Sequence, residues 1–171
     1  TEGRMEAAEF YTHPDYDTEY LLRAAAAANN GESPTDIGLK RAAEREGITQ
    51  DSVDREEPLI RRDPFDQRKM YTASFHKNGD AVHVYMAGAP EPLLERAENC
   101  DGKIREKVAA KVNKFAGGGL RVIGFAESQT FLRRRSGFPI EQISFIGLIG
   151  LRDPVRPGVK EAISKTSKAG I

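Results

Sequence analysis

The chain is poor in cysteine, histidine and tryptophan, and these shortages exclude several kinds of site. Its 171 residues include one cysteine, Cys100, and no tryptophan. A single cysteine excludes an internal disulfide and a cysteine-based metal cluster, and it fits a reducing compartment. The histidines, His13, His76 and His83, lie in different segments without a carboxylate or cysteine at ligand spacing. This pattern favours solvated or structural histidines over a metal site.

Long apolar runs and an excess of charge of one sign are also missing. No run approaches the roughly 20 apolar residues that cross a bilayer, and the N-terminus lacks the basic and apolar regions of a signal peptide. Lysine plus arginine equals aspartate plus glutamate at 26 each, so the net charge does not indicate a nucleic-acid surface. We expect a soluble folded unit that contacts neither nucleic acid nor the membrane directly.

Common phosphate-binding and catalytic motifs are absent as well. The sequence contains neither GxxxxGK[ST] nor GxGxxG, and it offers no convincing arrangement of Ser, His and Asp. The glycine-rich "FAGGGLR" at 115–121 lacks a strand before it and a helix after it. Its three glycines are therefore predicted to end a helix.

Capping residues and composition predict several helices. An acidic first turn and an alanine-rich stretch predict a helix that ends at Asn29 or Asn30. A second helix has Ser33 as its N-cap, Pro34 at the first helical position and Gly47 as its stop. Further helices are predicted over 89–100, 103–119 and 155–170.

An alternating pattern predicts a hairpin in the middle of the chain. Asn78 and Gly79 form the Asn-Gly pair that is the strongest short-range hairpin signal. Alternating apolar residues flank this pair on both sides: Tyr71, Ala73 and Phe75 before it, and Val82, Val84 and Met86 after it. Strands are also predicted over 120–128 and 143–153. Antiparallel strand pairs with helices grouped between them favour an α+β fold over a parallel sheet.

Five short segments in a fixed order carry a family resemblance. They are "SPTD" at 33–36, "PFDQRK" at 64–69, "AGAPE" at 87–91, "GLRV" at 119–122 and "GLRDPVRPGVKEAI" at 150–163. In this order they resemble the nucleotide-binding (N) domain of a P-type cation-transporting ATPase, over nearly the whole chain. The first three are similar to those of the calcium, magnesium, proton and sodium/potassium pumps. Heavy-metal pumps use a His-Pro pair, but His13 and Pro14 precede the first helix, so we regard their adjacency as coincidence.

The resemblance implies three parts and a cytoplasmic location. Residues 1–5 resemble the tail of the phosphorylation motif, 6–150 the nucleotide-binding domain, and 151–171 the return to the phosphorylation domain. Asp153, Pro154 and Arg156 would then belong to the hinge. The resemblance implies a soluble cytoplasmic piece of an integral membrane protein. Its partners would be ATP and the parent's phosphorylation and actuator domains.

An adenine pocket needs a stacking face and a group that reads the edge of the base. Phe65, which a Pro and an Asp flank, can offer the face, and Asp36 can accept from the exocyclic amine. Taken alone, a core phenylalanine and an aspartate that matches the helix dipole are the alternatives. The resemblance favours the nucleotide roles and adds Thr35, the neighbour of Asp36.

Phosphates need cations, and Arg68, Lys69 and Arg121 can supply them. Three residues separate Phe65 from Lys69, one fewer than in the family, and one residue reverses a side chain in a strand. Either a bulge restores its direction, or Arg68 or Met70 takes that position. Arg121 matches "GLRV" without a shift.

The "AGAPE" bend resembles a family loop that begins with lysine, where this chain has Ala87. Gly88 and Ala89 would let a ligand approach the backbone, and free amides at the bend would suit an anion. The charge of the loop is lost, through divergence or engineering.

In the parent pump, such a domain positions ATP for phosphoryl transfer to an aspartate. That aspartate would lie upstream of Thr1 and the Mg²⁺ ligands beyond Ile171, so the chain would bind nucleotide without hydrolysing it. One alternative is a regulatory or docking module on the same fold. Another is a haloacid dehalogenase-type phosphatase, but the DxDx motif that it needs is missing.

Overall fold

The computed structural model describes residues 5–29, 31–131 and 139–153. These residues form one six-stranded antiparallel sheet in the order β1-β6-β5-β4-β3-β2, together with five helices. The α+β prediction is thereby confirmed. In chain order the elements are β1 (Glu6–Thr12), α1 (Thr18–Ala28), α2 (Pro34–Arg45), α3 (Gln50–Glu56), β2 (Leu59–Asp66), β3 (Tyr71–Asn78), β4 (Ala81–Gly88), α4 (Pro90–Arg96), α5 (Gly102–Gly117), β5 (Arg121–Phe131) and β6 (Ser144–Arg152).

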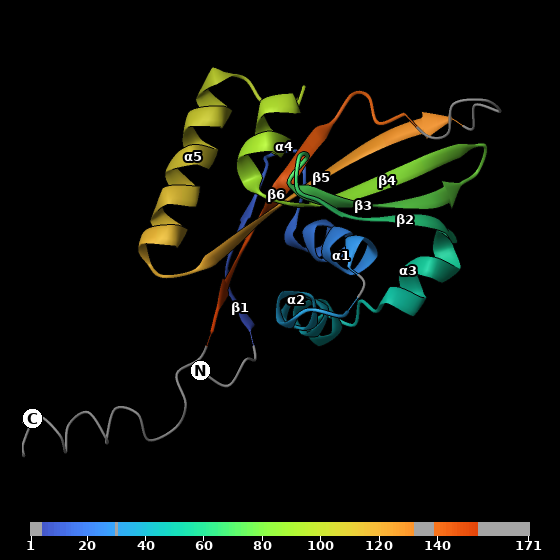
Figure 1. Cartoon of the computed structure of the whole chain (residues 1–171), viewed down its shortest axis with the longest axis horizontal. Helices are drawn as coiled ribbons and strands as arrows, with labels where there is room; N and C mark the ends of the chain where they lie inside the picture. Colours follow the sequence, from blue (N-terminus) through green and yellow to red (C-terminus); the bar gives the residue numbers. More distant parts are fainter. Residues whose placement is uncertain (1–4, 30, 132–138, 154–171) are drawn as a thin grey trace, which may run out of the picture.

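Helices cover both faces of the sheet, with α1, α2 and α3 on one side and α4 and α5 on the other (Figure 1). Each face has its own hydrophobic cluster. Along β4, Val84 and Met86 belong to the cluster beneath α4 and α5, whereas Tyr85 and Ala87 belong to the cluster beneath α1. Successive residues of a strand point to opposite faces, so β4 contributes to both cores.

The predicted first and second helices are confirmed as α1 and α2. The side chain of Asp17 caps α1 by accepting from the N–H of Tyr20 at 2.8 Å. Five consecutive alanines of α1, 24–28, are buried, and their small side chains let the helix lie close to its neighbours. Ser33 caps α2, Pro34 opens it, and Gly47 follows its end with φ +76°.

The central hairpin is confirmed, with its turn one residue later than the Asn-Gly pair suggests. Asn78 pairs with Ala81, so Gly79 and Asp80 form the two-residue loop, and Gly79 has φ +59°. Asn78 belongs to β3. All six alternating apolar residues around the turn are buried.

Other predicted elements also have counterparts in the described residues. The helices predicted over 89–100 and 103–119 correspond to α4 and α5, and Gly118 caps the end of α5 as the glycine-rich segment suggested. The strands predicted over 120–128 and 143–153 correspond to β5 and β6. The helix predicted over 155–170, and the hinge residues Pro154 and Arg156, lie outside the described residues. Asp153 is the last described residue of its segment and is partly buried.

A buried ionic network ties α1 to the sheet. His83 on β4 lies between two carboxylates: its Nδ1 is 3.1 Å from Glu57 Oε2, and its Nε2 is 2.7 Å from Glu127 Oε2. Tyr16 donates to Glu127 at 2.7 Å, and Tyr20 of α1 also donates to this carboxylate. The network therefore joins α1, the segment before β2, β4 and β5.

The network shifts the pKa of its members. Burial lowers the pKa of His83, but hydrogen bonds to Glu127 and Glu57 outweigh burial and raise it to about 9. Burial raises the pKa of Glu57 and Glu127, but their hydrogen bonds to His83 outweigh burial and lower both values. The hydrogen bonds from Tyr20 and Tyr16 lower the pKa of Glu127 further. His83 therefore has the structural role that the sequence favoured, through carboxylates far from it in the chain.

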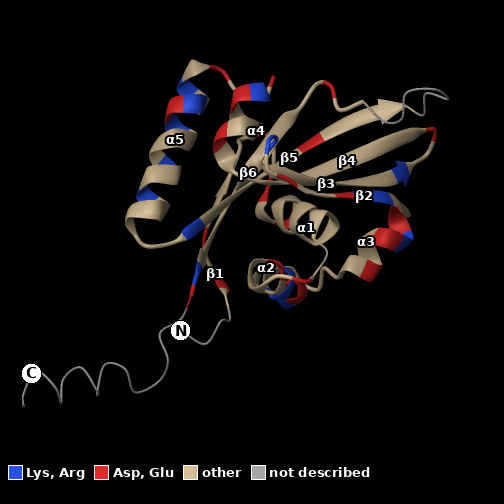
Figure 2. Cartoon of the chain, viewed as in Figure 1, with Lys and Arg blue, Asp and Glu red and all other residues tan. Residues whose placement is uncertain are grey.

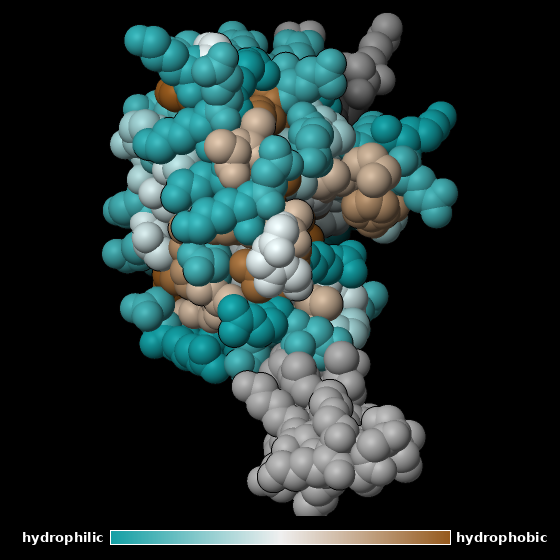
Figure 3. Space-filling model, turned by 90° about the vertical axis from the view of Figure 1, so that its left-hand side faces the viewer, coloured by the Kyte–Doolittle hydropathy of each residue, from teal (hydrophilic) through white to brown (hydrophobic). Residues whose placement is uncertain are grey.

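The outer surface carries charges of both signs, mixed along α3 and α5 (Figure 2). The face seen in Figure 3 is largely hydrophilic, with small hydrophobic areas between the charged side chains. Within the described part of the chain, no helix is long and apolar enough to cross a membrane.

Candidate functional site

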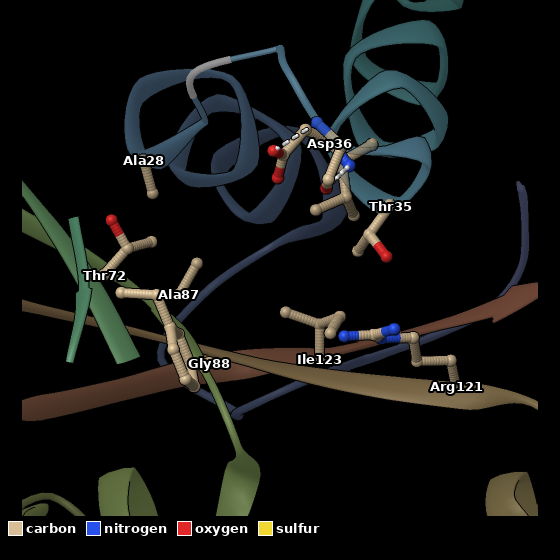
Figure 4. A pocket seen from close by; sticks show the side chains of 11 residues that line it. Ala28, Thr35, Asp36, Thr72, Ala87, Gly88, Arg121 and Ile123 are labelled. Atoms are coloured by element: carbon tan, nitrogen blue, oxygen red, sulfur yellow. Dashed lines mark hydrogen bonds between the residues drawn. The ribbon is translucent and has the colours of Figure 1, made fainter. Parts of the chain in front are cut away.

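A cavity of about 290 Å³ lies between the end of α1, the start of α2 and the strands β2 to β5 (Figure 4). Segments that are far apart in the chain meet there, with lining residues between Ala28 and Ile123. Six of the nine nucleotide-site residues predicted above line it: Thr35, Asp36, Phe65, Ala87, Gly88 and Arg121. The remaining lining residues are Ala28, Ser33, Leu39, Thr72 and Ile123.

Asp36 lines the cavity and also caps its own helix. Its Oδ2 accepts from the N–H of Ser33 at 3.0 Å, while Ser33 Oγ accepts from the N–H of Asp36 at 3.1 Å (Figure 4). Together these form a capping box. One carboxylate oxygen of Asp36 therefore stabilises the start of α2. Asp36 thus has a structural role in its helix and also lines the cavity.

Asn29 fixes the two helices that border the cavity. It is buried, and its amide donates to the C=O of Asp36 at 2.5 Å. Its Oδ1 also accepts from the N–H of Gly31 at 2.6 Å. Sequence reasoning identified Asn29 only as a helix end, because the contact depends on how α1 and α2 pack.

Phe65 lies at an irregular point of the edge strand β2. Phe65 is 54% exposed, which excludes the alternative that it is a core residue. Between Asp63, opposite Ala73, and Asp66, opposite Tyr71, β2 has one residue more than β3. This bulge includes Pro64, which has no N–H to give to a ladder. An exposed aromatic ring at the mouth of a cavity is suited to stacking.

The end of β4 forms the floor of the cavity. Ala87 is 9% exposed and pairs with Thr72 on β3. At Gly88, an added Cβ would lie 2.5 Å from the Cα of Tyr71, so only glycine fits this close approach of the strands.

At this bend the amide of Ala89 is already hydrogen-bonded within the protein. The N–H of Ala89 donates to the C=O of Met70 at 2.9 Å, and Pro90 has no N–H. Ala89 is also not among the lining residues. A neighbouring turn therefore uses the Ala89 amide, and the assignment of Ala89 to the nucleotide site stays a prediction.

The charged lining residues are Asp36 and Arg121. Figure 4 shows Arg121 at the start of β5 with its guanidinium group beside Ile123. In the described part of the chain, no group of three or more His, Cys, Asp or Glu residues could hold a metal ion. The cavity thus combines one cation, one carboxylate, an exposed ring and small residues on its floor.

Comparison with known proteins places this fold and cavity in a family. The family described as "P-type ATPase, cytoplasmic domain N" matches residues 23–158. The chain belongs to this family. The match includes the whole lining of the cavity.

Curated relatives of this N domain include three cation pumps. The chain is 30% identical over 148 residues to a cation-transporting ATPase, pma1, of Synechocystis sp., covering 81% of the chain and 16% of the relative. It is 31% identical over 137 residues to the sodium/potassium-transporting ATPase subunit alpha-1 of Oreochromis mossambicus, covering 67% and 13%. It is 28% identical over 203 residues to calcium-transporting ATPase 1 of Bacillus cereus, covering 100% and 22%. The chain thus spans only 13–22% of the length of these relatives.

Arg68 and Lys69 lie outside the cavity of this N domain. The Arg68 side chain is 94% exposed on the turn between β2 and β3. Lys69 borders a second cavity of about 330 Å³, which Phe65 also borders. The bulge in β2 lies before Lys69, at Pro64 and Phe65, and Met70 has φ +62°. The assignment of the family lysine position stays a prediction.

Proposed function

We propose that this N domain binds ATP in the 290 Å³ cavity, with the adenine ring against Phe65 and its exocyclic amine at the remaining oxygen of Asp36. The observation that carries the proposal is the meeting of Asp36, Phe65 and Arg121 at one cavity. These residues come from α2, β2 and β5, and each was predicted for a different chemical need. A chance meeting of three such groups is hard to explain by packing alone.

In the whole protein, the domain would position ATP for phosphoryl transfer to an aspartate of a neighbouring phosphorylation domain. Its contribution is proximity: it holds the base so that the terminal phosphate reaches a nucleophile elsewhere. Residues 1–5 and 151–171 would link it to that domain, with Asp153, Pro154 and Arg156 in the hinge. The parent would be a cation pump of the membrane, with this domain and an actuator domain in the cytoplasm.

Equilibrium dialysis of the 171-residue chain against ATP tests this proposal. We expect saturable binding of ATP that AMP displaces, because the proposed contacts are to the base. Absence of binding at millimolar ATP would instead favour a regulatory or docking module. Ala87 is the observation that favours that second function, because it leaves the floor of the cavity without the cation of the family loop.

No ATP hydrolysis is expected from this chain. Under this proposal the nucleophilic aspartate and the Mg²⁺ ligands of the reaction belong to the neighbouring phosphorylation domain, and the N domain contributes position alone. The measurement is phosphate release with ATP and Mg²⁺ against a sample without protein. Release that survives repurification and disappears on mutation of Asp36 or Arg121 would refute this expectation.

Replacing Ala87 by lysine is expected to tighten ATP binding several-fold. A charge-assisted hydrogen bond contributes roughly 1.5–3 kcal/mol when its geometry is good, and ordering a lysine side chain reduces this to about 1 kcal/mol. The gain should decrease with added salt, because salt screens partly exposed charges. The measurement is the ATP Kd of both proteins at low and high salt.

Ala87→Met serves as the matched control, since it adds a chain of similar length without charge. Equal ATP affinity for wild type and a folded Ala87→Lys protein would show that the phosphates do not lie near this residue.

A further inference from the structure

The connection from β2 to β3 is held in one shape by the side chain of Asp66. Its Oδ1 accepts from the N–H of Arg68 at 2.8 Å and is 3.4 Å from the N of Lys69. The C=O of Asp66 accepts from the N–H of Met70 at 2.7 Å and closes the turn. Aspartate is suited to this role because its short side chain reaches backbone amides two residues further on. The Arg68 amide, as the leading partner, lowers the pKa of Asp66.

This turn is docked on the bend that forms the floor of the cavity. Met70 has φ +62°, a left-handed conformation that a non-glycine residue adopts at a cost. Its C=O accepts from the N–H of Ala89 at 2.9 Å, and a side chain at Gly88 would collide with the Met70 and Tyr71 backbone. The two segments therefore fit together only while residue 70 keeps this conformation.

Phe65 lies between two points where its backbone is held. On one side, Thr72 Oγ1 donates to the C=O of Asp63 at 2.8 Å. On the other side, Asp66 caps the turn that follows β2. The residue is 54% exposed, so packing around the side chain contributes little to its direction. Its orientation must come mainly from the backbone on either side.

We propose that Asp66 is a positioning residue for the cavity: by capping the turn 67–70 it fixes Phe65 at the cavity mouth and seats Met70 on the Gly88–Ala89 bend. This inference rests on the proposed function, because its effect is on nucleotide binding. It assigns to the aspartate of "PFDQRK" a role distinct from contact with the ligand.

Three substitutions of Asp66 separate its hydrogen bonding from its charge. Asp66→Asn keeps a short side chain with an acceptor oxygen but loses the charge. Asp66→Glu keeps the charge but places the carboxylate one methylene further away, and Asp66→Ala loses both. Asp63→Ala is the matched control, because it removes a nearby carboxylate while the Asp63 C=O remains for Thr72. The probes are the ATP Kd and amide hydrogen exchange at Arg68 and Lys69.

We expect Asp66→Ala and Asp66→Glu to weaken ATP and AMP about three- to tenfold, as loss of one or two hydrogen bonds allows. The ATP Kd of Asp66→Asn and of Asp63→Ala should stay within about twofold of the wild-type value, because neither substitution removes the hydrogen bonds that cap the turn. Exchange at Arg68 and Lys69 should be faster in the Ala and Glu variants alone. In Phe65→Ala, the effect of Asp66→Ala on Kd should be clearly smaller than in wild type, since the ring that Asp66 positions is gone and only the seating of Met70 remains.

Other outcomes overturn the inference. If Phe65→Ala weakens ATP but Asp66→Ala and Asp66→Glu do not, the pocket stands and the positioning role fails. If Asp66→Asn loses as much affinity as Asp66→Ala, charge rather than capping is responsible. If Phe65→Ala leaves ATP binding unchanged, the proposed pocket fails and this inference fails with it.

Discussion

Replacing His83 by glutamine is expected to lower the free energy of unfolding by about 3 kcal/mol, because removing one partner of a buried ion pair costs about 3–5 kcal/mol. The His83 side chain is 6% exposed and its carboxylate partners Glu57 and Glu127 are 16% and 18% exposed. Without the imidazolium ion, two negative charges remain in a largely buried place. Urea denaturation of both proteins near neutral pH measures the difference.

His76→Gln is the matched control, since His76 is also buried but hydrogen-bonds to the C=O of Glu57 and to Ser74. It should cost about 0.5–1.5 kcal/mol, the net range for a neutral hydrogen bond. Combining His83→Gln with Glu127→Gln should restore part of the stability, because one unpaired charge is then removed. Equal costs for the two histidine variants would contradict the ionic role of His83.

The same network makes the stability of the folded protein depend on pH, with lower stability at high pH. The folded pKa of His83, about 9, exceeds the value of 6.5 for an ordinary histidine. The folded state therefore binds the proton more tightly, and this stabilisation is complete below pH 6.5 and is lost as pH rises through 9. Stability of wild type should fall over this range, and the fall should be smaller in His83→Gln.

Replacing Phe65 by alanine is expected to weaken ATP binding by roughly 1–3 kcal/mol, the value of stacking a base on an aromatic ring in nucleic-acid complexes. AMP should be weakened equally, since both ligands carry the same ring. Because the residue is 54% exposed, the melting temperature should change little. Calorimetric titration with ATP and AMP measures the two losses.

Phe131→Ala is the matched control, because Phe131 is 66% exposed and does not line the cavity. Its effect on nucleotide binding should be negligible. A loss below about threefold for Phe65→Ala, or an equal loss for both variants, would show that the ring does not stack on the base.

Sequence patterns predicted the elements whose signals are local. Ser33 and Pro34 mark the start of α2, and the alternation around Gly79 marks the hairpin, because caps and turns depend on neighbouring residues. The edge strand β1 was missed, since "EAAEFYT" alternates poorly and contains helix formers. The short helix α3 was missed as well, although the capping box of Thr49 and Ser52 is a signal that could have found it.

At the site, residue types were predictable but contacts between segments were not. The chemistry of base and phosphate recognition, together with the family resemblance, selected Asp36, Phe65 and Arg121, and these line one cavity. The sequence could not show that the Ala89 N–H donates to the C=O of Met70, because this hydrogen bond joins two turns that are distant in the chain. The His83 network was hidden for the same reason.

Amide and side-chain chemical shifts of the 171-residue chain, recorded during an ATP titration, show whether ATP binds in the 290 Å³ cavity. We expect saturable shifts at Thr35, Asp36, Phe65, Gly88 and Arg121, with AMP shifting the same residues near the base. His83 and Phe131, which do not line the cavity, should change little. Absence of shifts at millimolar ATP, or saturable shifts confined to residues away from the cavity, would show that ATP does not bind there.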